Sequence, residues 1–143
     1  MVLVMRLALN RPCPCHSGRK MKSCCGPWLK GKPAPSPVAL MRSRFAAYAL
    51  GMSAYIQATT DPEGPHHEPD EARWTSSIDA FCANTEFDGL EIHAQGEGQA
   101  EGYVDFSARL SAGTEDRSFR EYSLFRRRGG RWLYWGAKPS TSG

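Results

Sequence analysis

Four of the five cysteines of this 143-residue chain lie within thirteen residues, as one close pair, Cys13 and Cys15, and a second, Cys24 and Cys25. The segment has little apolar material on which to fold. Four thiolates around one tetrahedral ion would supply the missing fixed structure, so the spacing predicts a metal site with these four ligands. Zinc is the expected ion. Iron is the alternative, because four thiolates accept both metals.

Two other uses of these thiols are weighed against a metal site. Disulfides are disfavoured because C-x-C and adjacent cysteines are poor partners within each pair, and nothing indicates a secretory context. A reactive thiol, with His16 beside Cys15 as a base, is the third interpretation. Cys82 lies far away in an apolar helical pattern, which predicts a small buried hydrophobic residue rather than a fifth ligand.

The run C-P-C-x-S-G-x-x-x-K-x-C-C-G at residues 13–26 resembles the SEC-C motif, a small zinc-binding module also found at the C-terminal end of the SecA translocase ATPase. Later segments are similar to YchJ-type SEC-C proteins, at residues 40–48, 102–109, 120–125 and 130–134. The similarity covers nearly everything from residue 11 to residue 136. It implies a metal-binding motif followed by a cone-shaped roll like those of nuclear transport factors and cystatins.

Two positions depart from the SEC-C pattern. His16 stands where the motif usually has Gly, so a position that favours positive φ carries an imidazole that could compete as a ligand. Met21 stands where an aromatic residue usually lies between the two lysines. This second departure weakens the expectation that an aromatic ring there stacks on a partner.

Charge is distributed unevenly along the chain. Residues 1–35 hold seven basic residues and no acidic residue, whereas the remainder holds 11 basic and 15 acidic residues. Four thiolates with a divalent ion subtract two charges and leave about +5 on a small surface, which attracts phosphate or an acidic protein face. Arg19, Lys20 and Lys22 are therefore the predicted partner-binding residues. A solvated basic segment that binds nothing specific is the alternative.

Composition suggests one domain with a small appendage. With 41% hydrophobic residues, the chain can build one core of ordinary size. Alternating prolines predict a stiff linker at residues 33–37. The linker is predicted to separate a basic metal-binding segment, residues 1–32, from a roll, residues 38–137. Residues 138–143 are predicted to be a disordered tail. Chelation is therefore expected to disorder the segment before the linker and to leave the roll folded.

Three helices are predicted after the linker. A Ser-Pro pair at 36–37 is a capping signal, so the first helix starts there and runs to Gly51. The second is short and carries residues 54–56, and the third spans 68–84. Two adjacent histidines, at 66–67, lie in the loop between the last two helices and are expected to be exposed rather than metal-bound.

After Asn84 the apolar period changes to two. Four strands are predicted, at residues 90–94, 104–110, 119–125 and 132–135. Helices followed by an antiparallel meander imply an α+β fold, in which about three helices pack on a curved sheet of about four strands. The resemblance points to the same roll. This fold hosts enzymes, binding proteins and dimers, so it does not decide function.

One charged pair is predicted inside the roll. Arg44 shares a helical stripe with Phe45 and Tyr48, so it is carried into the core and needs a carboxylate. Glu121 shares a strand face with Ser123 and is the predicted partner, within direct hydrogen-bonding reach. The alternative is a pocket that binds an anion or performs acid-base chemistry. A structural pair is favoured, and no catalytic residue is predicted, because no His, Asp pair or Ser-His-Asp order converges there.

These features predict a binding protein rather than an enzyme. Its basic segment would dock on the ribosome, another polyanion or a protein, and its sheet is a candidate homodimer surface. SEC-C motifs of the translocase family contact ribosomes and the export chaperone, so the resemblance implies a role near translation, protein export or protein quality control. The alternative is a small-molecule binding protein, or an enzyme, that uses the pocket of the roll.

A cytoplasmic location without a membrane partner is expected. No apolar run approaches membrane-spanning length, and residues 1–9 lack a basic leader and a cleavage site. The reducing cytosol keeps thiols available for metal. The opening residues 1–5 are expected to be either an upstream start without a structural role or a short strand.

Overall fold

The structure, a computed structural model, describes residues 8–138. The elements, in chain order, are η1 (Met21–Ser23), α1 (Gly26–Leu29), α2 (Pro37–Leu50), α3 (Ser53–Ala58), α4 (Glu71–Ala83), β1 (Glu86–Glu97), β2 (Glu101–Ala112), β3 (Glu115–Asp116), β4 (Phe119–Arg128) and β5 (Arg131–Ala137). Within this part of the chain, no helix is both long enough and apolar enough to cross a bilayer. The short strand predicted at the start of the chain lies outside the described residues, and so does the predicted tail apart from Lys138.

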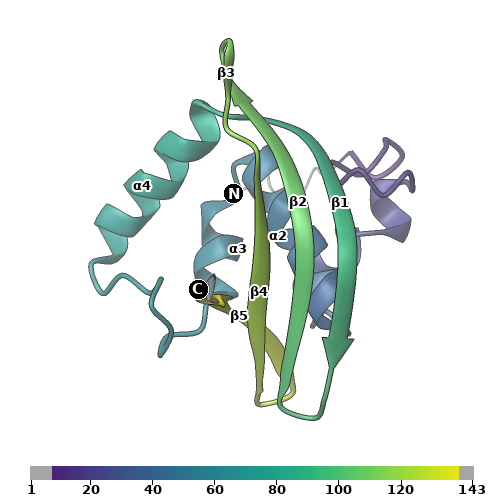
Figure 1. Ribbon diagram of the computed structural model, residues 1–143, viewed down its shortest axis with the longest axis vertical. Helices are drawn as coiled ribbons and strands as arrows, with labels where there is room; N and C mark the ends of the chain where they lie inside the picture. The colour runs from purple at the N-terminus through teal and green to yellow at the C-terminus, as the bar shows by residue number, and fades with distance from the viewer. Residues whose placement is uncertain (1–7, 139–143) are drawn as a thin grey trace, which may run out of the picture.

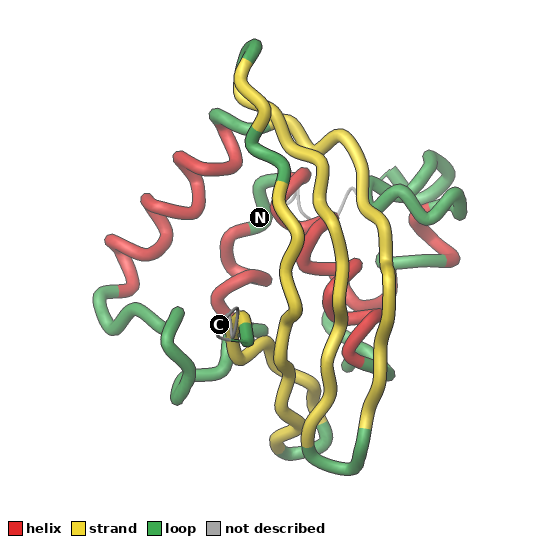
Figure 2. The backbone as a smooth tube through the Cα atoms, in the orientation of Figure 1, coloured by secondary structure: helices red, strands yellow, loops and turns green. Residues whose placement is uncertain are grey.

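The strands form one antiparallel sheet in the order β1-β2-β4-β5, with the short β3 paired to β2. The sheet curves around α2, and α4 lies on the side away from β1 (Figure 1). Figure 2 shows the same division into helices and long strands. The predicted α+β roll of three helices and a curved antiparallel sheet is confirmed, with β3 as an additional two-residue strand.

Buried and exposed side chains alternate along β2, and the buried ones form part of the core. Val104, Phe106 and Ala108 face α2 and are buried. The opposite face of the strand is polar, as expected from the period of two. There Asp105 accepts two hydrogen bonds from the Arg120 guanidinium, at 3.0 and 2.9 Å, and these bonds hold the pKa of Asp105 below its usual range.

Local signals set the ends of α2. The Ser36 hydroxyl accepts a hydrogen bond from the Ala39 amide at 3.2 Å, and Gly51 has the left-handed φ of 72° that ends many helices. Both ends are as predicted. Helix α4 begins at Glu71 rather than residue 68, because the Asp70 carboxylate caps it through the amide of Arg73.

Residues 8–32, which we call the knuckle, lie beside α2 and the edge strand β1 (Figure 1, purple). The His16 ring nitrogen Nε2 lies 2.9 Å from the carbonyl oxygen of Phe87 at the start of β1. The Arg42 guanidinium of α2 donates to the Cys15 carbonyl at 3.2 Å. The knuckle is thus packed against the roll rather than held away from it. Its ability to fold separately from the roll stays a prediction.

Candidate metal centre and cavity of the roll

The four predicted ligand cysteines converge. Their Sγ atoms all lie within 4.8 Å of one another and the residues are buried. Cys15 Sγ lies 3.5 Å from Cys24 Sγ, which in turn lies 3.9 Å from Cys25 Sγ. A tetrahedral zinc ion with Zn–S bonds of about 2.3 Å separates its sulfurs by about 3.8 Å. Cys13, Cys15, Cys24 and Cys25 therefore fit one tetrahedral metal ion.

Two tight backbone segments bring the cysteine pairs together. The first turns back on itself, with the Cys13 amide donating to the Arg19 carbonyl at 2.8 Å. Its turn requires left-handed φ at His16, 62°, and at Gly18, 87°. The second pair follows η1, where the Cys24 amide donates to the Met21 carbonyl at 3.1 Å. The predicted positive φ at position 16 is confirmed.

Hydrogen bonds among the thiols separate their pKa values. The pKa of Cys15 is lowered, chiefly because its sulfur accepts hydrogen bonds from Cys13 and Cys25. The pKa of Cys13 is raised to about 11, first by its hydrogen bond to Cys15. The pKa of Cys25 is also raised, by its hydrogen bonds to Cys13 and Cys15 and then by burial. A bound dication would replace these shared protons and favour the thiolate at every position.

Polar groups around the sulfurs complete the centre. The Ser17 hydroxyl lies 3.1 Å from Cys24 Sγ, and Arg42 Nη1 donates to Cys15 Sγ at 3.7 Å. A dication with four thiolates carries a net charge of about −2, so a neighbouring guanidinium stabilises it. Sequence reasoning missed Arg42, because its spacing to the cysteines carries no local signal. Only the charge of the site indicates that some cation should lie close by.

His16 contacts the roll instead of joining the cysteines. Its Nε2 atom is hydrogen-bonded to the Phe87 carbonyl, and its ring meets the ring of Phe45 edge-on with centroids 5.8 Å apart. The group of possible ligands in residues 8–138 contains the four cysteines alone. The imidazole therefore joins the knuckle to the roll.

We expect about one metal ion per chain after anaerobic purification, because the four sulfurs fit one tetrahedral ion. Elemental analysis measures this directly. Cys82→Ser is the matched control, since Cys82 lies outside the cysteine cluster, and it should leave the metal content unchanged. Less than about half an equivalent of zinc plus iron, or four thiols that react freely without a chelator, would contradict the site.

Arg44 is buried as predicted, but its partners differ from the prediction. The residue is 8% exposed. Its Nη1 atom donates to the Ile56 carbonyl at 3.1 Å and to the hydroxyls of Thr59 and Thr60 at 2.8 and 3.1 Å. The guanidinium lies over the ring of Tyr134, 4.6 Å from its centroid. All its hydrogen-bond acceptors within residues 8–138 are therefore neutral groups.

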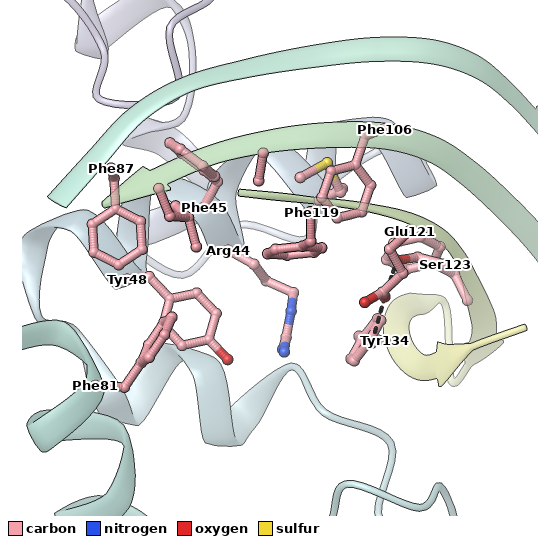
Figure 3. Close-up of a pocket in the computed structure, with 14 residues that line it drawn as sticks. Arg44, Phe45, Tyr48, Phe81, Phe87, Phe106, Phe119, Glu121, Ser123 and Tyr134 are labelled. Carbon is pink, nitrogen blue, oxygen red and sulfur yellow. Dashed lines mark hydrogen bonds between the residues drawn. The ribbon is translucent and has the colours of Figure 1, made fainter. Parts of the chain in front are cut away.

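The predicted direct ion pair between Arg44 and Glu121 is wrong. Glu121 Oε2 accepts hydrogen bonds from the Tyr134 hydroxyl, at 2.7 Å, and from the Ser123 hydroxyl. The physical reason is that α2 directs Arg44 toward the end of α3, while Tyr134 of β5 occupies the space beside Glu121 (Figure 3). Burial, and then the charge of Glu121, raise the pKa of Tyr134.

Arg44, Tyr48 and Glu121 nevertheless line one cavity of about 180 Å³ between the helices and the sheet (Figure 3). The other lining residues are mainly apolar: Met41, Phe45, Phe81, Phe87, Phe106, Ala108, Leu110, Phe119, Ser123, Phe125 and Tyr134. Concave, mostly apolar spaces with a few converging polar groups are typical of small-molecule sites. The three residues predicted as a buried pair or pocket are thus brought together around a cavity.

The predicted partner-binding residues lie on the surface of the knuckle. Arg19, Lys20 and Lys22 are exposed, and none of them takes part in the ion pairs found among residues 8–138. Lys32 is also exposed and lines a surface hollow together with Arg131 of β5. Sequence reasoning missed Arg131, which extends the basic surface from the knuckle onto the roll.

Residues 36–137 match the family model described as YchJ, middle NTF2-like domain. A UPF0225 protein of Chromobacterium violaceum is 39% identical over 131 residues, which cover 85% of this chain and 88% of the relative. The chain is a YchJ-type SEC-C protein. The recognised resemblance is thereby confirmed.

Two solved structures support the family and the fold. A SEC-C motif containing protein from Rhodopseudomonas palustris is 36% identical to this YchJ-type chain with a TM-score of 0.77, over 91% of this chain and 99% of the other. A SEC-C motif containing protein from Psychrobacter arcticus has a TM-score of 0.68 at 21% identity, over 100% of this chain and 88% of the other, and shows the fold alone.

Proposed function

We propose that this protein is a metal-stabilised cytoplasmic adaptor whose basic knuckle docks on an anionic partner near the ribosome, protein export or protein quality control. One observation carries the proposal: the exposed cations of the knuckle have no acidic neighbour in sequence and no ion pair within the described residues. Cations that no carboxylate neutralises attract polyanions at long range. Zinc is the proposed ion and iron the alternative.

The shape of the knuckle supports this function. Its cysteines are buried together, so the metal would fix the loop that carries Arg19 and Lys20 on the surface. A fixed loop presents its cations without the ordering cost that a flexible basic tail has on binding. The SEC-C motif named for the Rhodopseudomonas palustris protein supports the same assignment of the knuckle as a metal-binding motif.

Neutralising the three predicted partner-binding residues should weaken ribosome binding. The variant Arg19→Gln, Lys20→Gln and Lys22→Gln is expected to lower the slope of log affinity against log salt by up to about three, one for each phosphate that the knuckle no longer neutralises. Co-sedimentation with ribosomes over a salt series measures this slope.

The matched control neutralises three exposed cations of the roll, Arg73, Arg109 and Arg117. Its charge change equals that of the knuckle variant, but the three arginines lie outside the proposed docking surface. This control should therefore lower the affinity less and leave the salt slope nearly unchanged. Equal effects of the two variants would show that net charge, and not the knuckle, sets the affinity. An unchanged slope in the knuckle variant would show that the basic run is only a solvated face.

A second candidate function is small-molecule binding in the roll. The observation that favours it is the cavity of about 180 Å³, into which the buried Arg44 projects (Figure 3). An apolar cavity with one buried cation suits a ligand better than it suits packing alone. The two functions use different parts of the molecule, and no residue is needed for both.

A further inference from the structure

Arg44 has one edge of its guanidinium without a partner. All three of its hydrogen bonds come from Nη1, and within residues 8–138 neither Nε nor Nη2 has an acceptor. The residue is only 8% exposed, yet neither nitrogen is fully buried, so this edge opens onto the cavity and the hollow beside it. A buried guanidinium without a carboxylate partner is costly, and the Nε–Nη2 edge is suited to bind a carboxylate through two parallel hydrogen bonds.

The nearest acid of the cavity does not supply that carboxylate. Glu121 is hydrogen-bonded through Oε2 to the hydroxyls of Tyr134 and Ser123, and no ion pair joins it to Arg44. The Tyr48 hydroxyl, in contrast, points toward the space beside the guanidinium and has no hydrogen bond within residues 8–138 (Figure 3). A ligand there could accept hydrogen bonds from both Arg44 and Tyr48.

The rest of the cavity defines the body of the ligand. Six phenylalanines line it, at positions 45, 81, 87, 106, 119 and 125. Its volume of about 180 Å³ slightly exceeds the roughly 150 Å³ of an apolar cavity that holds benzene. One aromatic ring with a small head group therefore matches both the lining and the size.

An entrance is present beside the cavity. A neighbouring hollow of about 390 Å³ shares Arg44, Tyr48, Phe81 and Tyr134 with the cavity. Phe81 of α4 is 41% exposed, so its ring stands between the cavity and the solvent. This hollow offers a small ligand a route past Phe81 to the guanidinium.

We propose that the roll binds a small aromatic carboxylate, with its carboxylate on the Nε–Nη2 edge of Arg44 and its ring among the phenylalanines. This inference rests on the second function proposed above and names its ligand class. Aromatic pairs stabilise such a ring in edge-to-face geometry, and the lining already contains such pairs, for example Phe45 with Phe87. The carboxylate of the ligand supplies the direct partner for Arg44 that Glu121, bound to Tyr134 and Ser123, does not.

Benzoate is the probe, with benzamide as its neutral analogue of equal shape and benzylamine as a cationic analogue. In calorimetric titrations of the full chain, benzoate should bind about tenfold or more tightly than benzamide, as expected for a charge-assisted bidentate pair. Benzylamine should not bind detectably. Chemical shift changes on benzoate addition should concentrate at Phe81 and Phe119.

Variants locate the binding site. Arg44→Met should remove the preference for benzoate over benzamide, whereas Arg73→Met, an exposed arginine of α4, should retain it. Should Arg44→Met fail to fold, Phe119→Trp provides the second test, because Phe119 is 43% exposed at the cavity and a larger ring there should block binding.

The outcomes separate this inference from the function on which it rests. Equal binding of benzoate and benzamide would overturn the carboxylate class but keep a small-molecule cavity. No binding of any of the three probes would overturn the inference, and the small-molecule function would then lose its only supporting ligand. Binding of benzoate that Arg44→Met or Phe119→Trp leaves unchanged would place the ligand elsewhere and overturn the site. None of these results bears on the knuckle.

Discussion

Removal of the metal, by a chelator or by Cys15→Ser, is expected to unfold the knuckle and to lower the melting temperature of the roll without abolishing its cooperative transition. Besides the four cysteines, the large apolar side chains buried in the knuckle are those of Met21 and Leu29. Two such side chains cannot offset the conformational entropy of some 25 ordered residues, so the metal supplies most of the fixed structure.

The effect on the roll follows from the interactions that the knuckle makes with it. His16 is hydrogen-bonded to the Phe87 carbonyl and packs against Phe45, and Arg42 donates to the Cys15 carbonyl. The loss of one hydrogen bond costs about 1 kcal/mol, which corresponds to several degrees in the melting temperature of a domain of this size. The core of the roll lies between α2 and the sheet and does not depend on these interactions.

Amide hydrogen exchange measures the loss of structure in the knuckle, and a thermal melt measures the stability of the roll. Without metal, amides of residues 9–31 should lose protection while those of β2 keep it. Cys82→Ser is the control and should retain both the metal and the melt, since Cys82 lies outside the cysteine cluster. Knuckle amides that stay protected without metal would contradict the prediction, and so would complete loss of the cooperative melt of the roll.

The parts of the fold that local chemistry specifies were predictable from the sequence. The limits of α2 follow from Ser36 and Gly51, whose side-chain cap and left-handed φ act within one turn. The alternation in β2 follows from burial on one face of the sheet. The convergence of the four cysteines follows from their spacing, which is typical of a tetrahedral metal site.

Contacts between distant elements were not predictable in the same way. Periodicity indicates that Arg44 faces the core, but not that it reaches Thr59 and Thr60 instead of Glu121. That choice depends on the crossing of α2 with α3 and on the bulk of Tyr134, which come from tertiary packing. The helical turn α1 (Gly26–Leu29) and the strand β3 were missed because elements of four and two residues are too short to show an apolar period.

Substitution of Arg44 by Met is expected to destabilise the roll by about 2 kcal/mol, because the Thr59 and Thr60 hydroxyls lose their donor. The Ile56 carbonyl loses one donor but keeps the Thr60 hydroxyl, and removal of a buried charge without a carboxylate offsets part of the loss. Met fills a similar volume, so the loss reports the donors rather than a cavity. Denaturant unfolding measures it. Arg73→Met, on the exposed face of α4, is the control and should change the stability by less than about 0.5 kcal/mol.

Double-mutant cycles then identify the partner of Arg44. Combined with Thr60→Val, the Arg44→Met substitution should show a coupling of about 1 kcal/mol, since the two side chains share a hydrogen bond of 3.1 Å. Combined with Glu121→Gln, it should show a smaller coupling, because the two residues make no direct hydrogen bond and interact through Tyr134, whose ring lies under the guanidinium and whose hydroxyl donates to Glu121. A coupling to Glu121 that exceeds the coupling to Thr60 would restore the direct ion pair and would leave no free edge of Arg44 for a ligand.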